Sequence, residues 1–177
     1  MVPLSSIVAE KKRQAISLPI IDSALCPVPF GMTVLLSGDY GTGKSTLLAM
    51  IAERCAQQCK IDGSGYVVWA SGEETASGHI APRFDSLSLK RDYIHIIDST
   101  MPKYCHGNSL DVDKVLNACE EARFLFIDSV QTLVTAKYED SFRTGIHVSS
   151  AVTKWSQYGK RIAFLISQVN GQGETEG

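Results

Sequence analysis

The chain has 177 residues, of which 44% are apolar and 20% are charged, and this size and balance fit one globular α/β domain better than two. Seventeen Lys and Arg residues against nineteen Asp and Glu residues give a formal net charge of −2 at pH 7, which excludes a globally basic protein that coats nucleic acid. Apolar runs such as residues 67–70 are much shorter than the roughly 20 residues of a membrane span, and the N-terminus lacks the long apolar centre of a signal peptide, so we expect a cytoplasmic protein.

Short apolar runs alternate along the chain with amphipathic segments, which is the rhythm of βαβ units. Residues 32–37 are predicted to form a buried strand that runs into a Gly-rich turn, and apolar residues at helical spacing then predict a helix over 44–58. Residues 66–70 and 94–97 are the next two predicted strands, and a helix over 76–87 is predicted between them.

The second half of the chain continues the same alternation. Asp111 is the expected N-cap of a helix that ends at Glu121, and residues 124–127 form the fourth predicted strand. A helix over 142–158 and a fifth strand over 162–167 follow. Together these elements predict the α/β class, as a three-layer α/β/α sandwich with a mostly parallel sheet covered on both faces.

The two ends of the chain differ in composition from this core. Residues 1–30 contain several prolines and are predicted to be a lead-in segment with a short helix and a loop, and residues 31–177 are predicted to be the core domain. Residues 171–177 are rich in Gly and Glu, which predicts a mobile end.

Five cysteines are scattered along the chain without a Cys-x-x-Cys pair, which predicts reduced thiols rather than a disulfide framework. Cys55 and Cys59 share a helix face and could suggest a metal site. Because no second pair accompanies them, we favour buried thiols.

Residues 38–45 fit the pattern G-x-x-x-x-G-K-[ST] and stand between a predicted buried strand and a predicted helix, as a phosphate-binding loop requires. Gly41 and Gly43 would let the backbone curl so that successive N–H groups point inward and hold a polyphosphate. Lys44 would then reach the β- and γ-phosphates, Ser45 would bind Mg²⁺, and Thr46 would lie near the α-phosphate. The candidate nucleotide-binding residues are Gly38, Asp39, Tyr40, Gly41, Thr42, Gly43, Lys44, Ser45 and Thr46.

Polar side chains follow three of the predicted strands, and the carboxyl ends of parallel strands meet at one edge of a sheet. Asp128 ends an apolar strand in the pattern of a Walker-B aspartate that holds the magnesium shell, although it could simply cap the strand. Glu73 and Glu74 follow the second strand, and one of them, Glu73 before Glu74, could orient the attacking water; otherwise they open the next helix. Gln168 at the end of the last strand could touch the γ-phosphate or its water, or cap that strand.

These residues resemble the RecA-type ATPase core, and most of all the bacterial RadA/Sms recombination family. Residues 38–46 (GDYGTGKST) are similar to that family's phosphate loop, 66–75 (YVVWASGEET) to its strand ending in Ser-Gly-Glu-Glu, and 126–133 (FIDSVQTL) to its Walker-B segment. Residues 31–168 are covered in the same order. The resemblance implies a RecA-like P-loop NTPase that uses ATP and Mg²⁺ in DNA recombination, repair or replication, normally as a ring or filament.

By matching motif, the resemblance makes Glu73 the base, Lys44 and Ser45 the phosphate and metal ligands, and Asp128 the Walker-B residue. It also implies DNA-facing loops at residues 134–145 and 169–177. Only Lys137 and Arg143 give the first loop positive charge, so a solvated surface loop is the alternative there.

The expected partner is DNA, in single-stranded form, or a DNA-processing protein, with a homo-oligomer and no membrane. Two sequence departures bear on the subfamily: Tyr40 stands where the RadA/Sms loop usually has Pro, and residues 166–168 resemble the Gln-bearing strand end of RecA and replicative-helicase cores. An ATP-dependent switch or partner-binding module with little turnover is an alternative that would keep Lys44 and Ser45 but not need Glu73. A P-loop kinase is a further alternative, for which residues 137–143 are the lid candidate.

Overall fold

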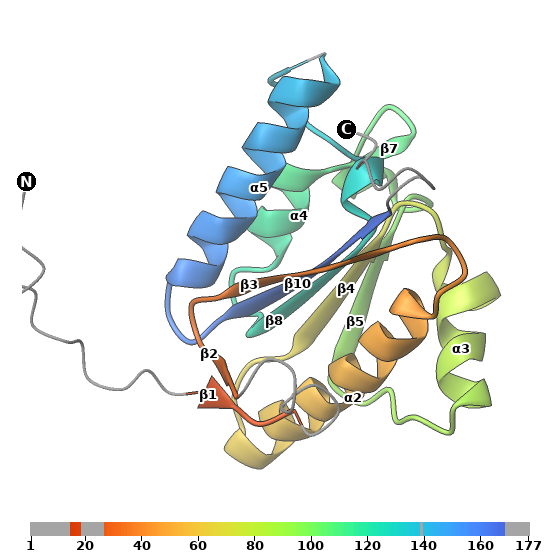
Figure 1. Cartoon of the computed structure of the whole chain (residues 1–177), viewed down its shortest axis with the longest axis vertical. Coiled ribbons are helices and arrows are strands. Elements are labelled where there is room, and N and C mark those ends of the chain that lie inside the picture. The colour runs from red at the N-terminus through yellow and green to blue at the C-terminus, as the bar shows by residue number, and fades with distance from the viewer. Residues whose placement is uncertain (1–14, 19–26, 139, 169–177) are drawn as a thin grey trace, which may run out of the picture.

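The computed structural model of the chain describes residues 15–18, 27–138 and 140–168. Its main sheet has five strands in the order β3-β10-β8-β4-β5, and every pair of neighbours is parallel (Figure 1). These strands are β3 (Thr33–Gly38), β4 (Val67–Ser71), β5 (Ile94–Asp98), β8 (Phe124–Asp128) and β10 (Ile162–Gln168). The five strands predicted from the sequence are all present.

Helices cover both faces of this sheet, so the predicted three-layer α/β/α sandwich is confirmed. The helices α2 and α3 lie on one face, and α4 and α5 lie on the other (Figure 1). Their bounds are α2 (Lys44–Asp62), α3 (Ala81–Ser86), α4 (Val112–Ala118) and α5 (Ser141–Gln157). Not one helix in the described part of the chain has the length and apolar character needed to cross a membrane.

Alternation along the central strands divides the core into two clusters. In β8, Phe124 and Phe126 belong to the cluster under α2, whereas Leu125 and Ile127 belong to the cluster under α4 and α5. Successive side chains of a strand point to opposite faces, and both faces of this sheet are covered. A central strand therefore reads as a continuous apolar run in the sequence.

Strand register brings the polar strand ends to one edge of the sheet. Ser71 at the end of β4 pairs with Asp128 at the end of β8, and Gln168 at the end of β10 pairs with Gly38 at the end of β3. The residues that follow β4, namely Glu73 and its neighbour, leave the sheet at this same edge. The strand register by itself therefore brings the phosphate loop to the same edge as three candidate site residues, Asp128, Gln168 and Glu73.

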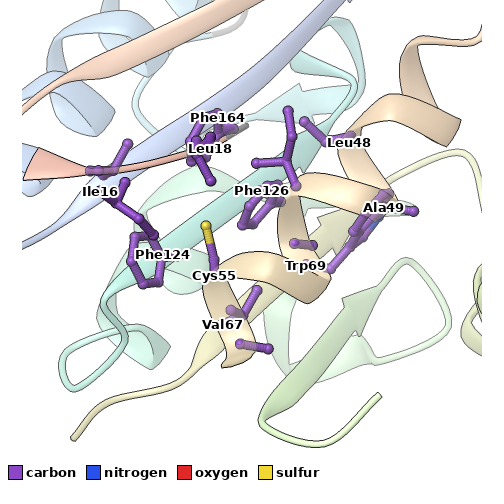
Figure 2. Close-up of a cluster of buried hydrophobic side chains, with 14 of the residues drawn as sticks. Ile16, Leu18, Leu48, Ala49, Cys55, Val67, Trp69, Phe124, Phe126 and Phe164 are labelled. Carbon is purple, nitrogen blue, oxygen red and sulfur yellow. The ribbon is translucent and has the colours of Figure 1, made fainter. Parts of the chain in front are cut away.

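An aromatic stack fills the cluster under α2 (Figure 2). The ring of Phe126 is parallel to those of Trp69 and Phe164, with centroids 6.1 and 4.8 Å away and interplanar angles of 9° and 15°. All three side chains are fully buried. Offset aromatic pairs of this kind add to the free energy that apolar burial contributes.

We expect Phe126→Ala to lower the free energy of unfolding by roughly 3–5 kcal/mol, because it leaves a cavity between two rings that the strands hold apart. Urea denaturation followed by tryptophan fluorescence measures this loss. The matched control is Phe142→Ala, at a side chain that is 75% exposed on α5, where we expect a change within about 0.5 kcal/mol. Equal stabilities of the two variants would contradict the central place of Phe126.

The helix predicted over residues 76–87 is divided in two. A π-helical turn, η2 (Ala76–Ile80), precedes α3. The N–H groups of His79 and Ile80 both donate to the Thr75 carbonyl, at 3.1 and 3.2 Å, so the first turn is wider than an α-turn. Pro82, which has no N–H to donate, stands at the start of the α-helical part.

Three further differences concern short segments. The helix predicted to end at Glu121 ends at Ala118, because Cys119 already has non-helical angles. A small sheet of β6 (Cys105–His106), β7 (Ser109–Asp111) and β9 (Leu133–Val134) was not predicted, and neither was the antiparallel pair of β1 (Ala15–Ile16) with β2 (Val28–Pro29). Strands of two or three residues are too short to show alternation. The short 3-10 turns are η3 (Pro102–Tyr104) and η4 (Val130–Thr132).

The predicted division at residue 30 stays a prediction. The mobile end predicted at 171–177 lies outside the described residues. Of the lead-in segment, in which a short helix is predicted, the structure describes only residues 15–18 and 27–30. Within those pieces, Ile16, Leu18 and Val28 pack into the cluster under α2.

The four cysteines in the described part of the chain are buried. Burial raises the pKa of Cys59 to about 11 and that of Cys119 to about 12. These two thiols are therefore protonated near neutral pH, which makes them poor nucleophiles.

Candidate nucleotide site

The loop between β3 and α2 has the backbone that the sequence predicts. Gly41 and Gly43 have φ angles of +76° and +86°, in the left-handed region where a side chain is strained. Helix α2 begins directly after Gly43, whose carbonyl accepts from the Leu47 N–H at 2.9 Å. The Thr42 hydroxyl donates to the Asp39 carbonyl at 2.8 Å and closes the loop on itself.

The ammonium group of Lys44 lies over the mouth of this loop. Its Nζ donates to the carbonyls of Gly38 at 2.8 Å and Asp39 at 2.6 Å. The free N–H groups at the start of α2 and the helix dipole point at the same place. The loop therefore presents a concentrated positive potential to an anion.

Asp128 is buried at the end of β8, with 5% of its surface exposed. Burial raises the pKa of this carboxyl, a hydrogen bond from Ser45 acts in the opposite direction, and the neighbouring Glu74 and Glu73 raise it further. Its Oδ2 has no hydrogen-bond partner among the described residues. A buried carboxylate oxygen without a partner is costly unless a cation completes it.

Glu73 is held between two strand ends. Its Oε1 accepts from the hydroxyl of Ser129 at 2.8 Å, and the Gln168 amide approaches both carboxylate oxygens at 3.3 Å. The end of β8 and the end of β10 thus fix the position of one carboxylate that comes from the end of β4. Gln168, predicted as a site residue, is in contact with Glu73.

Glu74 has a different environment from its neighbour. Arg83 on α3 donates two hydrogen bonds of 2.5 Å to it, from Nη1 to Oε2 and from Nη2 to Oε1. The Glu74 backbone N–H donates to the Ser71 hydroxyl at 3.0 Å. The sequence ranks Glu73 ahead of Glu74 as the carboxylate that orients water, and in the structure the two side chains have different partners.

Two contacts join the strand ends behind these carboxylates, and neither was predicted from the sequence. The Gln131 amide donates to the Ser167 hydroxyl at 3.0 Å and to the Gln168 carbonyl at 2.9 Å. A Cβ on Gly72 would come within 2.4 Å of the Thr132 hydroxyl, so only glycine fits between the turn after β4 and η4. Gln131 and Gly72 both stand in the segments that resemble RadA/Sms, which was the signal available.

These residues surround one cavity of about 400 Å³ at the carboxyl edge of the sheet. Most of the predicted site residues line it, namely Tyr40, Gly41, Gly43, Lys44, Ser45, Thr46, Glu73, Glu74, Asp128 and Gln168. The lining also includes three residues that were not predicted, His79, Arg83 and Ile166. Gly38, Asp39 and Thr42 belong to the loop but not to the lining. Tyr40, at the tip of the loop, is 86% exposed.

The first predicted DNA-facing loop, residues 134–145, carries cations that are already paired. Lys137 donates to Asp113 at 3.0 Å, and the Nε of Arg143 lies 3.5 Å from Asp140. Asp113 also accepts from Thr135 and His147, at 3.1 Å each, which ties this loop to α4 and α5. The second predicted loop, residues 169–177, lies outside the described residues.

A glycine-bearing loop between a buried parallel strand and a helix, with a lysine at its mouth and carboxylates at the same sheet edge, defines a P-loop nucleotide-binding domain. Comparison with known proteins narrows this class. The chain belongs to the AAA domain family, which matches residues 19–165.

Proteins similar in sequence to this chain include DNA repair proteins. The chain is 26% identical over 174 residues to the DNA repair protein RadA of Aquifex aeolicus (strain VF5), covering 95% of this chain and 35% of that protein. It is 31% identical over 185 residues to the DNA repair protein RadA of Mycobacterium tuberculosis (strain ATCC 25618 / H37Rv), covering 99% of this chain and 35% of that protein. The chain thus spans about a third of the length of these relatives.

Solved structures share the fold at lower identity. A DnaB-like replicative helicase has a TM-score of 0.59 and 13% identity, covering 80% of this chain and 40% of that one. A second structure, of an isolated ATPase domain, has a TM-score of 0.61 and 14% identity, covering 87% of this chain and 63% of that one. The chain therefore has the fold of a RecA-like P-loop NTPase domain and a RadA-like sequence, as the resemblance predicted.

Proposed function

We propose that this domain binds ATP with Mg²⁺ and hydrolyses it, as the motor or switch of a protein that acts in DNA recombination, repair or replication. The observation that supports this most strongly is that Lys44, Ser45, Asp128 and Glu73, from separate segments, line one cavity. A nucleotide-binding loop without a carboxylate to orient water would support binding alone.

In this proposal the loop holds the triphosphate. The N–H groups of residues 41–46 donate to the phosphate oxygens, and the dipole of α2 favours their negative charge. The Lys44 ammonium leaves the two loop carbonyls that it contacts and binds the β- and γ-phosphates instead. Thr46 lies beside the α-phosphate. The curled backbone at Gly41 and Gly43 is already formed, so little ordering is needed on binding.

Ser45 and Asp128 fit a magnesium ion. A hydroxyl and a buried carboxylate oxygen without a partner among the described residues are hard oxygen donors, the type that Mg²⁺ prefers, and phosphates supply further ligands. When bound, the ion would neutralise charge that develops on the phosphate oxygens.

Glu73 acts as the base in this proposal. A water oxygen attacks the γ-phosphorus, the bond to the oxygen that bridges to the β-phosphate breaks, and Glu73 accepts a proton from the water. ADP and inorganic phosphate leave. Ser129 and Gln168 hold the carboxylate in place, and in this proposal Gln168 also responds to the γ-phosphate.

A DNA partner is proposed because the RadA relatives are DNA repair proteins. A ring or filament of this chain is proposed from the resemblance to RecA-type proteins. A switch or partner-binding module with little turnover is a second candidate. The 134–145 loop offers a DNA backbone only two cations, Lys137 and Arg143, which form exposed ion pairs with Asp113 and Asp140.

Phosphate release measured with Mg²⁺, with and without single-stranded DNA, tests the proposal. We expect turnover that rises when DNA is added, and that effect should weaken as salt increases, since phosphate contacts are salt-dependent. ATP binding without turnover would favour the switch, and transfer of the phosphoryl group to an added acceptor would favour a kinase. Failure to bind ATP would overturn the proposal as a whole.

A further inference from the structure

Arg83 is a cation of the cavity that the proposed mechanism has not used. It lies on α3, nine positions after Glu74, and its side chain is 20% exposed. A π-helical turn and Pro82, at the start of this short helix, lie between Glu74 and Arg83 in the chain.

The pairing between Arg83 and Glu74 occupies both oxygens of that carboxylate. Each Nη donates one hydrogen bond, in the two-pronged geometry that a planar guanidinium forms with a carboxylate. Glu74 is 22% exposed, so solvent competes little for it. Both oxygens of this carboxylate are therefore engaged by Arg83 and are directed away from the role of orienting water.

Glu73 is held more loosely. It accepts one hydrogen bond of 2.8 Å from a hydroxyl, and the approach of the Gln168 amide is longer, at 3.3 Å. It therefore keeps acceptor capacity toward the cavity. The difference between the two glutamates lies in their partners and not in their place in the sequence.

Charge balance gives Arg83 a second effect. Three carboxylates line the cavity, Glu73, Glu74 and Asp128, whereas Lys44 and Arg83 are its Lys or Arg residues. A triphosphate adds several negative charges to the same space. Without Arg83, Glu74 would be a partly buried, unpaired charge beside that anion, which is unfavourable both for Glu74 and for the nucleotide.

We propose that Arg83 is a positioning residue of this site: it binds both oxygens of Glu74, cancels that charge beside the triphosphate, and leaves Glu73 as the carboxylate that orients water. This inference rests on the proposed function, since it concerns how ATP is turned over. The same chain supplies both members of the pair.

Three variants test it by steady-state ATP turnover: Arg83→Gln, Glu74→Gln, and the double variant with both substitutions. We expect Arg83→Gln to lower kcat at least about tenfold, because removing one member of a partly buried charge pair leaves the other uncompensated. The double variant carries two neutral amides in place of the pair, and we expect its kcat to return to within about threefold of the wild type. Glu74→Gln alone should cost less than Arg83→Gln.

Arg91→Gln is the matched control. Arg91 also pairs with a carboxylate, that of Asp85, at 3.2 Å, but on the surface, where the two side chains are 53% and 60% exposed. We expect it to turn over ATP at the wild-type rate. Thermal melting of every variant, with kcat measured well below each melting temperature, separates loss of fold from loss of rate.

If the double variant is as slow as Arg83→Gln, or slower, Arg83 does not act through Glu74 and the inference is overturned. If Glu74→Gln is slower than Glu73→Gln, then Glu74 is the base and the inference is also overturned. Should Arg83→Gln fail to fold, the double variant still decides, since it contains no unpaired charge. A wild-type protein that binds no ATP would instead overturn the proposed function.

Discussion

Lys44→Ala is expected to abolish ATP turnover, with a loss of at least about 100-fold in kcat/KM. Losses of this size follow when a preorganised cation or hydrogen-bond donor is removed from a reacting phosphate or oxyanion. The Lys44 ammonium is held at the mouth of the loop by two carbonyl groups, at 2.6 and 2.8 Å. Alanine removes the charge that meets the β- and γ-phosphates, whereas the curled backbone at Gly41 and Gly43 stays. Phosphate release and binding of a fluorescent ATP analogue measure the two parts of the loss.

Lys60→Ala is the matched control for this prediction. Lys60 lies on the same helix, and its side chain is 63% exposed and 4.0 Å from Asp92. An exposed ion pair of this kind contributes little to stability, roughly 0–1 kcal/mol, so the control should bind and hydrolyse ATP as the wild type does. Undiminished turnover in Lys44→Ala would remove the phosphate-loop assignment.

The parts of the site that could be predicted from sequence are those whose geometry is local. The loop at residues 38–45 is specified by two glycines and by the strand and helix on either side, all within a few residues. Asp128 and Gln168 could be assigned to one edge because strands of a parallel sheet end at the same side. In each case, a chain-order argument was enough.

Contacts that depend on strand order and side-chain direction could not be predicted. Gln131 reaches Ser167 across 36 positions in the sequence, and this requires that β10 lie beside β8. Arg83 contacts Glu74 from the far side of a π-helical turn and a proline, which interrupt the helix predicted over 76–87. Periodicity describes the face of a helix, but it does not detect a wider turn that rotates the following residues.

The choice between the adjacent residues Glu73 and Glu74 also depends on contacts that the sequence does not reveal. Two adjacent acids after a strand are equivalent in composition, and the sequence can only rank them. In the fold they differ because Ser129 meets one and Arg83 meets the other. Partners from the end of β8 and from α3, which are distant in the chain, give two identical side chains separate environments.

Glu73→Gln is expected to bind ATP with an affinity within about threefold of the wild type and to lower kcat about 100-fold, the range assigned to loss of a general base. In the wild type, the Ser129 hydroxyl donates to Glu73 Oε1 at 2.8 Å. Glutamine keeps the size of the side chain and an oxygen that can accept this hydrogen bond, but it cannot take a proton from water. A single-turnover experiment with labelled ATP separates the chemical step from product release.

Glu53→Gln provides the matched control, because Glu53 lies on α2 outside the cavity and accepts from Gln57 at 2.7 Å. It should hydrolyse ATP at the wild-type rate, while Glu73→Gln should accumulate bound ATP. If Glu73→Gln proved as fast as the wild type, the base would be Glu74 or a group elsewhere, and the hydrogen bonds from Ser129 and Gln168 would then serve to hold the strand ends together rather than to aim a carboxylate at water.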